Sequence, residues 1–187
     1  MQTPVFSAKL TGTPIGTLRL WATPAGIRRV DFDFDSERDA VRADEEVLAG
    51  DPPPHLSAAL RELRDYLEGR VRTFQVPVDL TGVTPFQSRV YDRLLEIPFG
   101  QVVTYGRIAD DIGANHAGAA RAVGQAVGAN PVPILIPCHR VVGADGRLTG
   151  FGGGLRRKAV LLHLEGIEVD GEQPSSRVHP EVLRLPL

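Results

Sequence analysis

The chain has 187 residues, of which 42% are hydrophobic and 24% charged, the composition of an ordinary soluble globular protein with one or two small domains. A single cysteine excludes an internal disulfide and a cysteine-rich zinc cluster, and the five histidines lack ligand spacing, so we expect no metal and no other cofactor. The amino terminus has no basic start followed by an apolar run, and no stretch approaches the ~20 apolar residues of a membrane span. We therefore expect a cytoplasmic protein without a membrane partner.

Three short segments rich in β-forming residues open the chain and are separated by turn sequences, at residues 5–10, 15–22 and 26–32. They predict a small antiparallel meander. Acidic residues then alternate with phenylalanine from Asp31 to Asp39, and two interpretations are open: a metal-binding carboxylate cluster or a solvated strand end. We favour the strand end, because no EF-hand glycine or terminal glutamate follows.

After the prolines at 52–54, leucines at helical spacing predict an amphipathic helix over residues 55–68. Residues 74–80 are typical of an edge strand, since Pro77 removes one ladder donor. Residues 81–83 are the best boundary between two domains. Nothing in residues 1–83 suggests chemistry.

Helix caps mark the start of the second half. Thr84 and Pro85 are an N-cap and N1 pair, and the helix that they begin stops before Pro98. A second N-cap at Thr104 opens a shorter helix that ends at Gly113.

A third helix, predicted over residues 117–127, is built of small residues with Arg121 as its one long side chain. Two short helices joined by a glycine-containing turn resemble a helix-turn-helix, although helical hairpins are common and the pattern alone is a weak sign of DNA binding. Small residues let a DNA backbone approach closely, and Arg121 could then enter the base stack or contact phosphates. The alternative for Arg121 is a surface salt bridge.

The distribution of charge bears on the same question. Residues 1–85 hold 10 basic and 13 acidic side chains, whereas residues 86–166 hold 9 basic and 6 acidic ones. The net charge of -2 argues weakly against a nucleic-acid partner, but a polyanion would meet the second half of the chain.

The only cysteine lies at the end of an apolar run. Residues 133–136 predict a strand, Pro137 ends it, and Cys138, His139 and Arg140 follow. A thiol with a pKa of ~8.5 is mostly protonated at neutral pH, so a nucleophilic cysteine needs a neighbouring base or cation. Because neighbouring strand residues point to opposite faces, we expect His139 to reach the sulfur through a water. The alternative is that Cys138 is only a buried small hydrophobe.

Beyond residue 142 the sequence predicts a hairpin at 143–146, a glycine-rich loop at 149–154 that either closes over a ligand or is merely flexible, and a helix over 155–164. The first turn of that helix holds Arg156, Arg157 and Lys158, which is unfavourable for the helix dipole and indicates a polyanion nearby. We expect residues 171–187 to form a loose tail.

These motifs together resemble the O6-alkylguanine-DNA alkyltransferases. The residues that carry the resemblance are Pro137-Cys138-His139-Arg140 after Asn130-Pro131-Val132-Pro133-Ile134-Leu135-Ile136, with Ala120-Arg121-Ala122-Val123-Gly124, Thr84-Pro85-Phe86-Gln87, Val103-Thr104-Tyr105, Gly152-Gly153 and Leu161-Leu162-His163-Leu164-Glu165-Gly166. The likeness is strong over residues 84–166 and only general over residues 1–83.

The fold class we expect is α+β, in two domains. Residues 1–83 would form a small antiparallel sheet with a helix, ribonuclease H-like by resemblance. Residues 84–170 would form a mainly helical, winged helix-turn-helix-like domain that carries Cys138.

The resemblance implies a DNA repair enzyme, a methylated-DNA–protein-cysteine methyltransferase, that flips O6-alkylguanine out of the duplex and transfers the alkyl group irreversibly, once per molecule, to Cys138. It implies that His139 draws the thiol proton through a water while Glu165 holds and polarises the imidazole. Tyr105 would protonate guanine N3 as O6 is released. A thiol pKa lowered by ~2 would favour the thiolate by ~2.7 kcal/mol.

The resemblance also implies the DNA contacts. Arg121 would fill the space that the base vacates, with its helix in the minor groove, and Asn130 would hold the turn before the active-site strand. Further contacts to the base or the DNA are expected from Ala120, Gly124, Arg140, Val141, Phe151, Gly152 and Gly153. Many relatives have Tyr and Ser where this chain has Phe151 and Gly152, so main-chain donors would read the base there. The expected partner is double-stranded DNA containing O6-alkylguanine, bound by a monomer.

Other classes of protein stay open at this point. An alkyltransferase-like protein binds the lesion without transfer, but another residue takes the place of the cysteine in that group. A transcription regulator would place the same helices in the major groove, yet it has no use for Cys138, His139 and Glu165 together. A cysteine hydrolase would need an oxyanion hole and would turn over, so the number of turnovers per molecule distinguishes it from a transferase.

Overall fold

The computed structural model describes residues 3–32, 51–114, 116–171 and 176–178. The chain divides into two compact units, Met1–Thr81 and Gly82–Leu187. No helix in these described ranges is long and apolar enough to cross a membrane.

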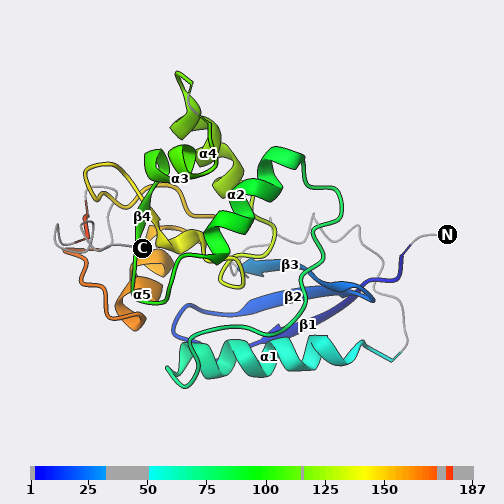
Figure 1. The fold of residues 1–187 in the computed structure, drawn as a ribbon. Coiled ribbons are helices and arrows are strands. Elements are labelled where there is room, and N and C mark those ends of the chain that lie inside the picture. Colours follow the sequence, from blue (N-terminus) through cyan, green and yellow to red (C-terminus); the bar gives the residue numbers. More distant parts are fainter. Residues whose placement is uncertain (1–2, 33–50, 115, 172–175, 179–187) are drawn as a thin grey trace. The chain divides into compact units, whose positions relative to one another are not determined.

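The first unit is built on a three-stranded antiparallel sheet in the order β1 (Phe6–Leu10), β2 (Leu18–Thr23) and β3 (Gly26–Phe32) (Figure 1). This confirms the predicted meander. Helix α1 (Pro54–Leu67) contacts all three strands and begins one residue before the predicted start. The side chains that α1 buries are Leu56, Ala59, Leu63, Tyr66 and Leu67, which is the apolar stripe read from the leucine spacing.

The predicted edge strand at residues 74–80 is wrong in extent, because only one parallel bridge forms, between Ile27 and Val78. The Ile27 N–H donates to the Pro77 carbonyl at 2.9 Å, and the Asp79 N–H donates to the Ile27 carbonyl at 2.9 Å. Pro77 has no N–H with which to extend the ladder. Gly26 allows the close approach, since a Cβ at that position would lie 2.7 Å from the Pro77 oxygen.

A metal site in the acidic stretch finds no support in the described residues. Asp31 accepts hydrogen bonds from Trp21 Nε1 (2.9 Å) and Arg29 Nε (2.8 Å), and the rest of the stretch, from Asp33 to Asp39, lies outside the described residues. Among the residues that are described, no three His, Cys, Asp or Glu side chains are grouped so that they could hold a metal ion.

The second unit begins with three helices, α2 (Pro85–Leu95), α3 (Tyr105–Asp111) and α4 (Ala119–Gly128) (Figure 1). Both predicted caps are present: the Thr84 hydroxyl accepts from the Gln87 N–H, and the Thr104 hydroxyl accepts from the Arg107 N–H, each at 3.2 Å. Helix α4 starts two residues later than predicted, because Gly118 takes a left-handed conformation (φ 86°) as its N-cap.

The remainder of the second unit packs around a short parallel pair, β4 (Val103–Thr104) and β5 (Val141–Val142), and helix α5 (Leu155–Leu164). The loose tail predicted from residue 171 is wrong for the described residues 176–178. Leu148 donates to the Ser176 carbonyl at 2.8 Å and Val178 donates to the Gly146 carbonyl at 3.0 Å. The buried cluster there comprises Val102, Val142, Leu148, Ala159, Leu162, Ile167 and Val178.

Candidate active site

Cys138 begins a turn of 3₁₀ helix, Cys138–Arg140, and does not end a strand as the apolar run predicts. The only pairing in residues 133–136 is an isolated bridge between Pro133 and Ile136. Prolines at positions 133 and 137 supply no N–H donors, so a continuous ladder is not available to this segment. The reactive side chains are therefore presented by a tight turn.

Asn130 holds the chain that leads into this turn. Its Nδ2 donates to the Ile136 carbonyl at 2.9 Å, and its Oδ1 accepts from the Val132 N–H at 3.0 Å. Between them Ile134 adopts a positive φ of 76°, an unfavourable conformation for a β-branched residue. The two hydrogen bonds of the Asn130 side chain thus fix a strained loop immediately before Cys138.

The Cys138 thiol is buried, with 4% of the residue exposed, and burial raises its pKa. Hydrogen bonding by Asn130 and the positive charge of Lys158 act in the opposite direction without overcoming the burial. The sequence-based expectation of a lowered thiol pKa is therefore wrong for the protein without DNA. At neutral pH the resting sulfur carries its proton.

His139 and Glu165 lie in direct contact beside the cysteine turn. His139 Nε2 is 2.9 Å from Glu165 Oε1, and both side chains have no exposed surface. Burial lowers the pKa of His139, although Glu165 raises it, so the imidazole is neutral at neutral pH.

Glu165 is ionised and therefore sets the tautomer of His139. Burial by itself raises the pKa of this carboxyl, but hydrogen bonds from His139 and Arg140, together with the charge of Arg140, hold it at about 2. An ionised carboxylate only accepts hydrogen bonds, so the proton of the neutral imidazole lies on Nε2. Nδ1 then carries the lone pair and is the basic nitrogen.

Arg140 lies against the same carboxylate and is buried, with 7% of its side chain exposed, while its role in DNA binding stays a prediction. Its Nε is 3.0 Å from each Glu165 oxygen, Nη2 donates to Oε1 at 2.8 Å, and Nη1 donates to the Ile97 carbonyl at 2.6 Å. The Gly100 N–H adds a bond to Oε2 at 3.1 Å. Glu165 is thus fixed from three directions.

Tyr105 opens α3, directly after the Thr104 cap. A Cβ added at Gly124 would lie 3.7 Å from the Tyr105 ring, so the ring lies against the bare backbone of α4. Burial raises the pKa of the Tyr105 phenol, a hydrogen bond from Thr149 lowers it, and Cys138 is close enough for its charge to contribute. The phenol is a neutral acid at physiological pH.

Lys158 is a residue of this site that the sequence pattern did not reveal. It was predicted to face a polyanion at the surface, but it is fully buried, and its Nζ donates to the Val141 carbonyl (2.5 Å) and the Thr149 carbonyl (2.7 Å). Burial lowers its pKa to about 8. Val141, expected to read the base through its carbonyl, already accepts this bond, and the second lone pair of the oxygen stays available.

The residues expected at the DNA differ in exposure. Ala120 and Arg121 are exposed in the first turn of α4, and Arg121 forms no ion pair with any described residue. In the loop before α5, Gly152 is exposed, Phe151 is half-buried and Gly153 is buried. The Gly153 carbonyl accepts from Arg157 Nη1 at 3.0 Å, which ties the loop to α5.

A buried thiol beside a carboxylate–imidazole pair is the arrangement of a protein that uses cysteine as a nucleophile. Residues 8–80 match the family described as 6-O-methylguanine DNA methyltransferase, ribonuclease-like domain, and residues 85–167 match the 6-O-methylguanine DNA methyltransferase, DNA binding domain. A methylated-DNA–protein-cysteine methyltransferase of Mycolicibacterium paratuberculosis is 43% identical over 156 residues, 82% of this chain and 88% of the relative. One from Mycobacterium tuberculosis is 54% identical over 113 residues, 60% of this chain and 67% of the relative.

Solved structures agree with the sequence matches. The crystal structure of Mycobacterium tuberculosis O6-methylguanine methyltransferase has a TM-score of 0.71 and 41% identity, covering 86% of this chain and 92% of that one. The structure of the Mycobacterium tuberculosis protein in complex with DNA has a TM-score of 0.72 and 42% identity, with the same coverage. The chain belongs to the 6-O-methylguanine DNA methyltransferase family, which confirms the expected family and the two-part α+β fold.

Proposed function

We propose that this protein repairs DNA by taking the alkyl group of an O6-alkylguanine onto Cys138, once per molecule. The observation that carries the proposal is the buried Cys138 beside the His139–Glu165 pair, in a chain of this family. The relatives are named as methylated-DNA–protein-cysteine methyltransferases, and one was solved with DNA. Lesion binding without transfer and transcriptional regulation are disfavoured because neither uses such a cysteine.

Activation of the sulfur begins with both Cys138 and His139 uncharged. Cys138 is protonated at rest, and His139 is a neutral imidazole whose Nδ1 is the base, because Nε2 donates to Glu165. A water between Nδ1 and the thiol passes the proton to the imidazole as the sulfur attacks. Glu165, already ionised, then stabilises the imidazolium.

Displacement at the alkyl carbon forms a C–S bond and breaks the bond to O6, so an electron pair moves onto the guanine. Tyr105 protonates guanine N3 as this charge develops. The proton that His139 took from the thiol then returns to the Tyr105 oxygen through solvent. One proton leaves the thiol and one reaches the base. The products are an S-alkyl cysteine and guanine protonated at N3, which becomes ordinary guanine when it exchanges this proton with solvent for one on N1. No cofactor enters this sequence.

The alkylated base must leave the duplex to reach a buried sulfur, at a cost of a few kcal/mol. Helix α4 is suited to lie in the minor groove, because its exposed first turn carries small residues that let the backbone approach. Arg121, which has no ionic partner among the described residues, fills the vacated space and offsets part of this cost.

The experiment is the intact mass of the protein after incubation with a duplex oligonucleotide containing O6-methylguanine. The expected result is a gain of one methylene group on nearly every molecule, absent in Cys138→Ser and absent with an unmodified duplex. A protein that binds the lesion duplex and stays unmodified would belong to the binding-only class. Repeated turnover would indicate a hydrolase and would overturn the proposal.

A further inference from the structure

The phenol of Tyr105 is held from two sides, by Gly124 and by Thr149, and no role was assigned to Thr149 above. Thr149 Oγ1 donates a hydrogen bond to the Tyr105 hydroxyl oxygen at 3.2 Å, across 44 positions of sequence. On the other side the ring lies against Gly124. The ring and the hydroxyl oxygen are therefore placed before any base arrives.

The hydrogen-bond inventory of a phenol explains what this contact does. A phenol oxygen has one proton to give and two lone pairs with which to accept. Because Thr149 donates to a lone pair, the proton of Tyr105 is free to point at a different acceptor, and no described residue accepts it. When that proton passes to the base, the Thr149 hydroxyl stabilises the negative charge left on the oxygen.

Lys158 fixes Thr149 in turn. Its buried ammonium group donates to the Thr149 carbonyl at 2.7 Å and to the Val141 carbonyl at 2.5 Å. Val141 follows the Cys138–Arg140 turn directly, so one side chain links the chain after the nucleophile to the loop that carries Thr149. The distance between thiol and acid is thereby set by a short, buried connection.

We propose that Thr149 is a positioning residue for the acid Tyr105, and that Lys158 fixes the Thr149 main chain relative to the turn that carries Cys138. This inference rests on the proposed transfer reaction and adds a residue to it. Among the described residues, Thr149 forms no hydrogen bond with the Cys138 sulfur. It acts through the Tyr105 hydroxyl alone, by orienting the proton and by stabilising the phenolate that forms.

The test compares Thr149→Val, which keeps the shape and loses the hydroxyl, with Thr149→Ser, which keeps the hydroxyl. The measurement is the single-turnover rate of methyl transfer at saturating lesion duplex. We expect Thr149→Val to slow transfer about five- to tenfold, the range of one lost hydrogen bond, with an unchanged Kd for the duplex. Thr149→Ser should stay near the wild-type rate. The matched control is Thr73→Val, an exposed threonine of the first unit.

A double-mutant cycle separates positioning from a general effect on the loop. In a Tyr105→Phe background, Thr149→Val should cause no further loss of rate, because the oxygen on which it acts is gone. The same five- to tenfold loss in both backgrounds would show that Thr149 supports the loop only, and would overturn the inference. A Thr149→Val rate equal to that of the wild type would do so as well.

A second readout does not need transfer. Burial and the Thr149 bond act oppositely on the phenol, so the pKa of Tyr105 should rise in Thr149→Val and return in Thr149→Ser, as followed by NMR of ring-labelled tyrosine. If the wild type transfers but this pKa does not move, the inference fails and the proposed function stands. If the wild type never alkylates Cys138, the proposed function fails, and with it the catalytic meaning of Thr149.

Discussion

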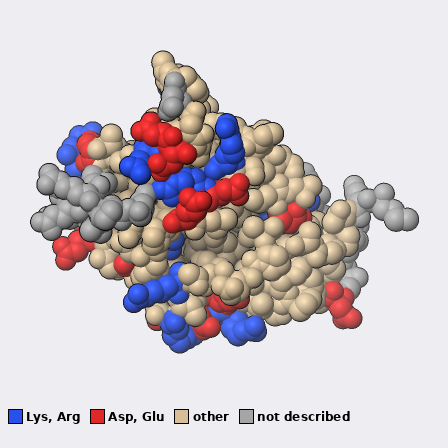
Figure 2. Space-filling view, in the orientation of Figure 1, with Lys and Arg blue, Asp and Glu red and all other residues tan. Residues whose placement is uncertain are grey.

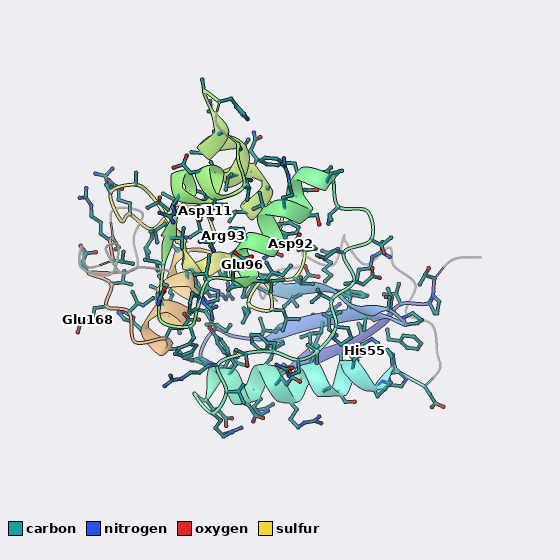
Figure 3. The ribbon with its side chains drawn as sticks, in the orientation of Figure 1. His55, Asp92, Arg93, Glu96, Asp111 and Glu168 are labelled. Atoms are coloured by element: carbon teal, nitrogen blue, oxygen red, sulfur yellow. The ribbon has the colours of Figure 1, made fainter. Side chains whose placement is uncertain are left out.

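Two arginine–carboxylate networks in the second unit use the same chemical groups and differ in almost every other respect. Glu165 meets Arg140 and His139 in a space without solvent, and its side chain has no exposed surface. Asp111, at the end of α3, is 2.7 Å from Arg93 and 2.8 Å from Arg107 and keeps 20% of its side chain exposed. Figure 3 shows Asp111 and Arg93 together between α3 and α2, and Figure 2 shows that acidic and basic groups alternate over this face.

The difference shows how surroundings decide the role of an ion pair. At the surface, water reaches the ions, and the pair of Asp111 with Arg107, whose side chain is 63% exposed, contributes ~1 kcal/mol or less. In the interior, an ion that loses its partner has no water to replace it. The buried network can therefore dictate the protonation of His139, whereas the exposed one only helps to hold two helices together.

The largest effect is expected from Glu165→Gln. The amide leaves Arg140 without a counter-ion and no longer forces the His139 proton onto Nε2, so we expect a loss of about 3 kcal/mol or more in the free energy of unfolding. Transfer to Cys138 should slow at least a hundredfold, the scale of a lost acid–base partner. Urea unfolding and single-turnover mass spectrometry measure the two effects.

The matched control is Glu96→Gln, because Glu96 on the exposed side of α2 is 3.8 Å from Arg93 with 70% of its side chain exposed. It should change neither quantity. A Glu165→Gln protein as stable as the control would contradict the view that the buried network differs in kind from the exposed one.

Lowering the pH should reveal the contribution of the buried Glu165 network to stability without a mutation. The pKa of Glu165 is about 2 in the folded protein against an ordinary 4.5, so its stabilisation is complete above pH 4.5 and is lost as the pH falls toward 2. The expected loss is roughly 3 kcal/mol. The lowered pKa of His139 acts in the same direction below pH 6.5, because unfolding lets the imidazole take up a proton.

Urea unfolding at a series of pH values between 7 and 3 would measure this loss. In Glu165→Gln the slope between pH 4.5 and 3 should be clearly smaller. An identical slope in the two proteins would assign acid unfolding to other carboxylates.

A buried carboxylate of the first unit offers an intermediate case. Asp79 accepts from the Thr23 hydroxyl at 2.6 Å and from the Thr81 N–H at 3.0 Å. No described arginine forms an ion pair with it, although the charge of Arg28 lowers its pKa. We expect Asp79→Ala to cost about 1–3 kcal/mol of stability, the penalty for unpaired buried partners. The rate of transfer per folded molecule should be unchanged, and a slower rate would mean that the first unit takes part in the chemistry.

The smallest effect is expected from Asp111→Asn. We predict a loss of ~1 kcal/mol or less in the free energy of unfolding, most of which disappears at high salt because exposed charges are screened. Thermal unfolding at low and high ionic strength measures it. A loss as large as that of Glu165→Gln would remove the distinction on which the comparison rests.

The parts of this protein that sequence could predict are those fixed by local chemistry. Thr84 and Thr104 cap helices through hydrogen bonds to residues three positions ahead, so the start of each helix can be predicted from the local sequence. The three strands of the first unit are likewise separated by recognisable turn residues. Cys138 and His139 could be singled out from the apolar run that precedes them, whereas Glu165 was found only because its motif resembles a known family.

What could not be predicted depends on distant partners. Lys158 looks like a surface residue in its helix, and only the carbonyls of Val141 and Thr149 explain its burial. The Thr149–Tyr105 hydrogen bond joins residues 44 positions apart, and no periodic pattern in the sequence reflects such a contact. The turn at Cys138 was misread because apolar residues between prolines suit a strand and a buried loop equally well.

The short segment Ser176–Val178 has a consequence for how the protein is made. Val178 belongs to the same buried cluster as Val102, so that cluster stays incomplete until residue 178 has left the ribosome. The described strands of the first unit and helix α1 are complete by residue 67, and the bridge between Ile27 and Val78 by residue 78, so this unit is free to fold early. During synthesis, therefore, the sheet is ready well before the loop that carries Thr149 is secured.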